Sequence, residues 1–258
     1  MLWSWTLSVL LAAAGAAATA PQAVSFPTSD GGRVHADLYG AGDHGVVLAH
    51  GGRFNKESWK EQAVVLAGAG YRVLAIDFRG YGESRGGGDT DDPYAGIYLD
   101  VLAAVRWLRD AGARTVSVVG GSMGAGAAAE AMVVAEPGEI DRAVLLAPYS
   151  IDRPEAIKGS KLFIVTRDDP NARGEPRLVK IREQFERAPE PKELLVLEGS
   201  AHAQYIFDTD QAGPLMDAIL RFLNGEGSAS SSPASGPGGA TVATMAHLTV
   251  SWEFDTGG

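Results

Sequence analysis

Six short, mostly apolar runs lie within residues 34–223, and they constrain the fold more than any other feature of the sequence. They occupy residues 46–49, 71–76, 116–119, 143–146, 162–165 and 194–197. Short runs of this composition are typical of strands buried on both faces, as in a parallel sheet. Helical segments lie between most of them. The sequence therefore predicts an α/β fold, a mostly parallel central sheet flanked by helices.

Two local patterns add detail to this architecture. Asp92-Pro93 has the form of a helix start, a capping residue followed by proline in the first turn. Apolar residues then recur at helical spacing up to Gly112, at positions 97, 101, 105 and 108. Near the N-terminus, residues 24–38 alternate weakly around Asp-Gly-Gly at 30–32. This pattern predicts an antiparallel hairpin that begins the sheet.

The N-terminal segment differs in composition from the rest of the chain. Residues 7–18 form an apolar run too short to span a bilayer, and Ala-Thr-Ala at 18–20 has the form of a cleavage site. We expect residues 1–20 to be a signal peptide. The mature protein would then be secreted or periplasmic, without stable membrane insertion. The alternative is an uncleaved hydrophobic N-terminus on a cytoplasmic protein.

The C-terminal segment is also distinct. Residues 225–239 are nearly all Gly, Ser, Pro and Ala, which is typical of a flexible linker. Residues 248–254 alternate apolar and polar side chains, which fits either one strand or an unstructured tail. We therefore expect residues 21–224 to form the folded domain and residues 225–258 to form a linker and tail.

Composition excludes several classes of function. The net charge is −10, so no basic surface is available for nucleic acid or for an anionic membrane. The chain has no cysteine, which excludes disulfides, thiolate chemistry and cysteine-ligated zinc. No other pattern in the sequence implies a metal or an organic cofactor.

A Gly-Gly-Ser-Met-Gly segment at residues 120–124 matches the G-x-S-x-G pattern of a nucleophile on a strand-to-helix turn. The chain has 33 glycines, and the pattern occurs again around Ser84. Context separates the two matches. An apolar run leads into Ser122 and a helix-forming stretch follows it, whereas Ser84 follows a turn and precedes three glycines. The sequence predicts Ser122 as a nucleophile and Ser84 as a turn residue.

A serine nucleophile needs a base, and in this architecture the chain order is Ser, acid, His. His202 follows the last apolar run and satisfies that order. Asp168 and Asp169 both follow the fifth run, where a carboxylate could orient the imidazole. We favour Asp169 as the acid and expect Asp168 to be a surface or turn residue.

A His-Gly-Gly-Arg segment follows the first apolar run. Backbone N–H groups must point at a developing oxyanion, and the expected donors are the N–H groups of Gly52 and Met123. We expect His50 to hold this loop and not to act as the base. Arg53 and Phe54 are candidates for substrate binding, with a surface salt bridge as the favoured alternative for Arg53.

Together and in this order, the motifs resemble the α/β-hydrolase superfamily over residues 34–223. The resemblance rests on His50-Gly51-Gly52, Asp-Phe-Arg-Gly-Tyr-Gly-Glu-Ser at 77–84, Gly-Gly-Ser-Met-Gly at 120–124, Asp169, and Gly-Ser-Ala-His at 199–202. It implies the α/β-hydrolase fold, a Ser-Asp-His triad, and a structural turn at residues 77–84 near the site. The chain is similar to capless serine esterases of the dienelactone-hydrolase-like branch. Some members of that branch use a cysteine nucleophile, which this chain lacks.

Only residues 147–160 connect the fourth and fifth apolar runs, where many members insert a helical cap. We therefore expect no cap domain and an open site, suited to small soluble esters. The expected function is hydrolysis of a small-molecule carboxylic ester through an acyl-enzyme; thioesters, lactones and small amides could use the same groups. The alternatives are a catalytically inactive binding protein on this fold, or an acyltransferase or thioesterase. No oligomeric state follows from the pattern.

Overall fold

The computed structural model of this 258-residue chain describes residues 20–88, 92 and 94–226. The predicted signal peptide, apart from Ala20, and the predicted tail beyond Glu226 lie outside the described residues. Within the described part of the chain, no helix is both long and apolar enough to cross a bilayer.

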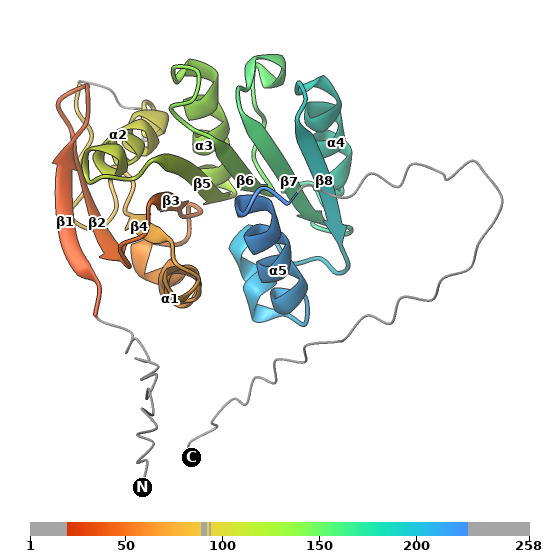
Figure 1. The fold of residues 1–258 in the computed structure, drawn as a ribbon. Coiled ribbons are helices and arrows are strands. Elements are labelled where there is room, and N and C mark those ends of the chain that lie inside the picture. The colour runs from red at the N-terminus through yellow and green to blue at the C-terminus, as the bar shows by residue number, and fades with distance from the viewer. Residues whose placement is uncertain (1–19, 89–91, 93, 227–258) are drawn as a thin grey trace, which may run out of the picture. The chain divides into compact units, whose positions relative to one another are not determined.

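An eight-stranded sheet forms the centre of the molecule, in the order β1-β2-β4-β3-β5-β6-β7-β8 (Figure 1). The strands are β1 (Gln22–Pro27), β2 (Arg33–Tyr39), β3 (His44–Ala49), β4 (Arg72–Ile76), β5 (Thr115–Gly121), β6 (Arg142–Leu146), β7 (Ser160–Thr166) and β8 (Lys192–Leu197). β1 and β2 pair antiparallel, as do β2 and β4, and all other pairs are parallel. The predicted hairpin and the six predicted strands are confirmed, but the edge strand β8 is mostly half-buried and not buried on both faces.

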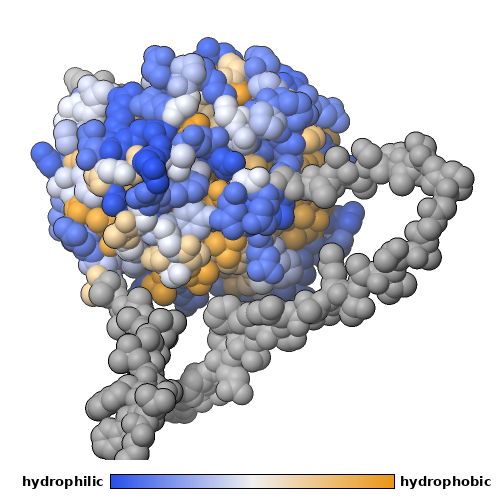
Figure 2. Space-filling model, viewed as in Figure 1, coloured by the Kyte–Doolittle hydropathy of each residue, from blue (hydrophilic) through white to orange (hydrophobic). Residues whose placement is uncertain are grey.

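Helices cover both faces of the sheet. They are α1 (Lys60–Gly68), α2 (Ile97–Asp110), α3 (Met123–Val134), α4 (Arg177–Arg187) and α5 (Ala212–Leu223), with short 3₁₀ turns η1 (Lys56–Trp59), η2 (Pro154–Ala156) and η3 (Ala203–Asp208). In Figure 1, α1 and α5 lie on one side of the sheet, and α2, α3 and α4 lie on the other. Figure 2 shows a mostly hydrophilic face with small apolar patches. The apolar side chains of the central strands are buried between the two helical layers.

The predicted helix start at Asp92 is wrong, because α2 begins at Ile97. The Asp92 carboxylate accepts a hydrogen bond from the Tyr94 N–H at 2.9 Å, and the Asp92 carbonyl accepts one from the Ala95 N–H at 3.1 Å. Asp92 therefore caps a separate turn. Gly96 separates this turn from the helix, since its φ of +72° is left-handed and not helical.

The connection between β6 and β7 contains only η2 as regular structure, so the described chain carries no cap domain there. This confirms the expected capless architecture. The carboxyl ends of the parallel strands meet at one edge of the sheet, where Ala49 of β3 pairs with Gly120 of β5, and Thr166 of β7 pairs with Leu197 of β8. Residues that follow these strands are therefore brought together, as in other open α/β sheets.

Candidate functional site

Three side chains predicted to act together form a hydrogen-bonded chain at this edge. The Oγ of Ser122 lies 2.8 Å from Nε2 of His202, and Nδ1 of His202 lies 2.7 Å from Oδ2 of Asp169. Ser122 follows β5, Asp169 follows β7 and His202 follows β8. Asp169 is fully buried, whereas the His202 side chain is 27% exposed. The carboxylate is thus shielded from water, and the imidazole reaches the surface where a substrate could meet Ser122.

Ser122 sits on a strained turn between β5 and α3. Its φ of 51° and ψ of −106° are unusual for a residue with a side chain. The neighbouring glycines are required by close packing. A Cβ on Gly120 would lie 2.4 Å from the carbonyl oxygen of Gly124, and a Cβ on Gly124 would lie 2.2 Å from that of Ala49. The turn holds the Ser122 hydroxyl out of the sheet toward His202.

The structure distinguishes the two candidate acids. Asp168 is exposed, whereas Asp169 is buried and bonded to His202. The second carboxylate oxygen of Asp169 lies 3.3 Å from Nε of Arg177, whose backbone N–H also donates to the Asp169 carbonyl at 2.8 Å. Sequence reasoning missed Arg177, because nothing in the sequence indicates that the start of α4 folds back onto this loop.

Two backbone N–H groups beside Ser122 are available to a ligand. The N–H groups of Gly52 and Met123 donate no hydrogen bond within the described residues. Met123 begins α3, where the first N–H groups lack intrahelical partners and carry partial positive charge. A Cβ on Gly52 would lie 3.8 Å from the sulfur of Met123, so the two residues face each other. The structure therefore places the two residues predicted to supply the oxyanion donors in the wall of one cavity with Ser122.

Two side chains that the sequence did not indicate hold the Gly52 loop. The Tyr81 hydroxyl donates to the Gly52 carbonyl at 2.8 Å. The side-chain oxygen of Gln204 accepts the Gly51 N–H at 2.6 Å, and its amide nitrogen donates to Ser58 at 2.9 Å. Gln204 is buried and lies two residues after His202. It therefore connects the loop that carries the imidazole to the loop that carries an oxyanion donor.

His50 and Ser84 both have structural surroundings. His50 is fully buried, accepts the Phe78 N–H on Nε2 at 3.2 Å, and bonds through Nδ1 to the Gly51 carbonyl at 2.8 Å. Burial lowers the pKa of His50 to about 4, so the ring is neutral and fixed at physiological pH. Ser84 is also fully buried, and its hydroxyl accepts the His35 N–H at 2.8 Å. Neither side chain lies in the Ser122 hydrogen-bonded chain.

A cavity of about 850 Å³ opens over Ser122. Its walls include Arg53, Tyr94, Glu130, Tyr149, Arg177 and Tyr205, together with Gly52, Met123 and His202. Arg53 shares this wall with Asp92, and the surface salt bridge expected as its alternative role stays a prediction. Phe54 is not among the described wall residues; its ring packs on Tyr205 with centroids 4.9 Å apart. Among the described residues, no group of three or more His, Asp or Glu side chains could hold a metal ion.

The profile of the alpha/beta hydrolase family matches residues 46–248. The chain belongs to this family. The match extends past the domain boundary predicted at residue 224, into the part of the chain that the structure does not describe. The predicted boundaries at residues 20 and 224 therefore stay predictions.

Several curated relatives of this chain carry haloperoxidase names. A putative non-heme chloroperoxidase of Synechocystis sp. is 33% identical over 136 residues, which cover 48% of this chain and 47% of the relative. A non-heme chloroperoxidase of Streptomyces lividans is 36% identical over 122 residues, 46% of this chain and 42% of the relative. The matched region thus spans less than half the length of these relatives.

Solved structures with the same fold include esterases. An esterase of Pyrococcus furiosus superposes with a TM-score of 0.65 at 21% identity, over 79% of this chain and 91% of its own. An esterase of Exiguobacterium antarcticum superposes with a TM-score of 0.64 at 16% identity, over 79% of this chain and 100% of its own. At such identities the likeness shows the fold alone.

Proposed function

We propose that this hydrolase-family protein cleaves carboxylic esters with Ser122 as the nucleophile, His202 as the base and Asp169 as the acid. One observation carries the proposal. The three side chains form an unbroken hydrogen-bonded chain whose serine faces an open cavity and two N–H groups without partners. The alternative of an inactive binding protein gives no reason for this arrangement.

The groups account for each step of the reaction. His202 removes the Ser122 proton as the hydroxyl oxygen attacks the ester carbonyl, and the N–H groups of Gly52 and Met123 stabilise the oxyanion. The imidazolium, stabilised by Asp169, then gives that proton to the departing alcohol. Water, activated by the same imidazole, attacks the acyl-enzyme and releases the acid and free Ser122.

The shape of the site supports a substrate class and a branch of the family. With no cap over the cavity, little protein encloses a bound molecule, which suits small soluble esters. We place the chain with capless serine esterases similar to the dienelactone-hydrolase branch, with serine in place of cysteine. The signal-like segment supports secretion or a periplasmic location, which N-terminal sequencing of the exported protein would test.

The names of the curated relatives favour a second candidate, peroxide-dependent halogenation. Hydrogen peroxide can replace water as the nucleophile on an acyl-enzyme. The product is then a peracid, which can oxidise a halide ion in solution. This reaction needs the same acyl-enzyme, so it extends the first candidate.

The test is hydrolysis of p-nitrophenyl esters of increasing acyl length by the purified protein. We expect turnover with the highest kcat/KM for short and medium chains. A parallel assay with acetate, hydrogen peroxide and bromide measures the second candidate. Absence of ester turnover at every chain length would contradict the proposed function.

A further inference from the structure

The cavity over Ser122 continues along α3 to a carboxylate that the triad does not use. Glu130 follows Ser122 by eight positions, and both line the same cavity. At ~1.5 Å per helical residue, their Cα atoms are separated by about 12 Å along the helix. Glu130 is therefore beyond the reach of the reacting carbonyl, but within reach of the far end of an extended substrate.

The ring of Tyr149 forms the floor between these two points. Gly126 leaves space for it, since a Cβ there would lie 2.1 Å from the Tyr149 ring. The Tyr149 hydroxyl donates to the Glu130 carboxylate at 3.1 Å. Burial and the nearby Glu130 raise the pKa of Tyr149, so the hydroxyl keeps its proton and stays a donor. The contact holds the Glu130 carboxylate at the end of a flat aromatic surface.

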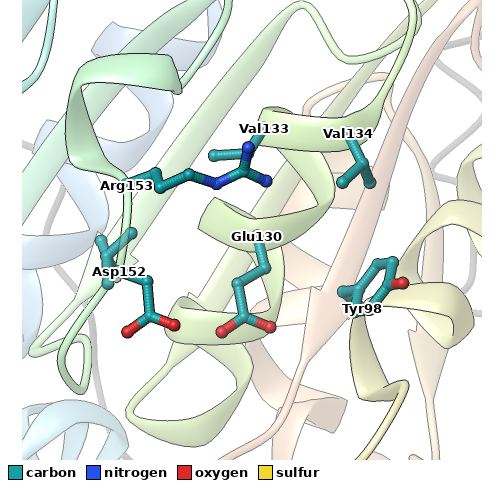
Figure 3. A pocket seen from close by; sticks show the side chains of 7 residues that line it. Tyr98, Glu130, Val133, Val134, Asp152 and Arg153 are labelled. Atoms are coloured by element: carbon teal, nitrogen blue, oxygen red, sulfur yellow. The ribbon is translucent and has the colours of Figure 1, made fainter.

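Among the described residues, the Glu130 carboxylate is hydrogen-bonded to Tyr149 and not ion-paired. Within the described residues, no Lys, Arg or His nitrogen forms an ion pair with this half-buried carboxylate. Burial and the nearby Asp152 raise the pKa of the Glu130 carboxyl, and the hydrogen bond from Tyr149 only partly offsets this effect. Figure 3 shows the Glu130 and Asp152 carboxylates pointing to the same side, whereas Arg153 extends toward Val133. An incoming cation would supply the missing countercharge.

A second, adjoining cavity of about 270 Å³ is also lined by Glu130. Its walls include Tyr98, Asp152 and Arg153, so it offers an aromatic ring and a second carboxylate beyond Glu130, next to one guanidinium. Aromatic faces and carboxylates together favour ammonium groups. Glu130 thus lines both the cavity over Ser122 and a second cavity with an aromatic wall.

Two arginines also line the cavity over Ser122, one from the segment after β3 and one from the segment after β7, on either side of β5 in the sheet. Arg177 is paired with Asp169, and Arg53 is exposed and directly follows Gly52. Arg177 and His202 come from segments after β7 and β8, and the departing alcohol must lie against His202 to receive its proton. Glu130 and Tyr149 come from α3 and the segment after β6. With the alcohol against His202, we place the acyl part of the substrate along α3 toward Glu130.

We infer that Glu130 selects esters whose acyl arm carries a basic or quaternary nitrogen about 10 Å from the reacting carbonyl. This inference rests on the proposed ester hydrolysis and deepens it by naming the substrate class. Glu130 is a specificity residue here, since it contacts the substrate away from the reacting atoms.

The test compares two p-nitrophenyl esters of equal length and shape. One carries a terminal trimethylammonium group on an octanoyl chain, whose quaternary nitrogen cannot attack the ester. The other carries a tert-butyl group in its place. For the unmodified protein we expect kcat/KM to be about tenfold higher for the cationic ester, equivalent to about 1.4 kcal/mol. Glu130→Gln, which keeps an oxygen for Tyr149, should bring this ratio to about one, and Glu130→Lys should invert it.

Asp168→Asn is the matched control, because it removes one exposed negative charge near the triad but outside the described cavity wall. It should keep the tenfold ratio. If the unmodified protein hydrolyses both esters with equal kcat/KM, or if Glu130→Gln keeps the preference, the inference is wrong while the esterase function stands. If neither ester is hydrolysed, the proposed function itself has failed.

Discussion

Two serines that each bond to a histidine lie near the two ends of strand β5, Ser117 within the strand and Ser122 directly after it. At the carboxyl end, Ser122 lies 2.8 Å from Nε2 of His202. At the amino end, Ser117 lies 2.9 Å from Nε2 of His44. The two hydrogen bonds are almost equal in length, so the bond itself does not distinguish a nucleophile from a structural serine.

The surroundings of the two pairs differ in every other respect. Ser117 is a fully buried strand residue, paired in the ladder with Val46 and Arg142. Within the described residues no carboxylate hydrogen bonds to His44, whose ring instead packs edge-on against Tyr71. Ser117 therefore has neither an acid behind its histidine nor space for a substrate.

Ser122 has what Ser117 lacks. Its backbone is strained out of the strand, Asp169 holds its histidine, and two N–H groups without partners face the cavity. The comparison indicates that a serine–histidine pair can act in catalysis only where it is combined with an acid, oxyanion donors and space for a substrate.

Replacing each serine in turn should give the largest difference. Ser122→Ala should lower kcat by about 10⁶-fold, because no other described hydroxyl faces His202. Ser117→Ala should leave kcat/KM nearly unchanged and lower the free energy of unfolding by about 1 kcal/mol, the value of a buried hydrogen bond. Ester kinetics and urea unfolding measure both. Equal loss of activity in the two variants would mean that Ser122 has no special role.

The acid is the next point at which the two ends differ. Asp169→Asn should lower kcat by about 10⁴-fold, because an amide holds the imidazole in the wrong tautomer. Asp168→Asn should cost little, since Asp168 is exposed and does not contact His202. Kinetics with one activated ester on the paired variants decide the assignment. If Asp168→Asn lowered kcat strongly and Asp169→Asn did not, Asp168 would be the acid of the triad.

The oxyanion donors should be sensitive to Gln204. Gln204→Met removes the acceptor of the Gly51 N–H and should lower kcat about tenfold with little change in KM, less than the ~10²–10³-fold cost of deleting a donor. Gln204→Glu keeps an acceptor oxygen and should retain most of the activity. An equal decrease of kcat in the two variants would contradict a positioning role. So would a change that affects KM and leaves kcat unchanged.

The smallest effect on catalysis is expected at His44. Burial and the nearby Arg142 lower the pKa of His44, so the folded protein binds a proton there less readily than the unfolded chain. Its contribution to stability is therefore present above about pH 6.5 and lost as the pH falls below it. His44→Gln should make the loss of unfolding free energy between pH 7 and pH 5 shallower. Its pH–rate profile should match that of the unmodified protein, and a shifted profile would contradict a structural role.

Sequence reasoning was most accurate where chemistry follows local pattern. The strands were predictable because buried parallel strands are short and mostly apolar, and Asp169 was favoured because it follows such a strand. The start of α2 was missed because Gly96 interrupts the helix pattern that begins at Asp92. Sequence alone also could not separate Ser117 from other buried polar residues.

Contacts between distant segments were not predictable. Gln204 meets Gly51 across 153 positions, and no periodicity links them. Arg177 meets Asp169 only because the segment between them folds back on itself. Tyr149 fits over Gly126 through the packing of the β6–β7 connection on α3. Each depends on tertiary structure that no local pattern encodes.

Labelling with a fluorophosphonate tests the central claim most directly, because the reagent bonds covalently to a serine only where a base and oxyanion donors activate it. The account predicts one label per chain, which fragmentation of the tryptic peptide 115–142 places on Ser122, with none on Ser117 of the same peptide and none on Ser84. Labelling should disappear in Ser122→Ala and in His202→Ala, and should be unchanged in Ser117→Ala. A label on another serine, or none on the folded protein, would contradict the account.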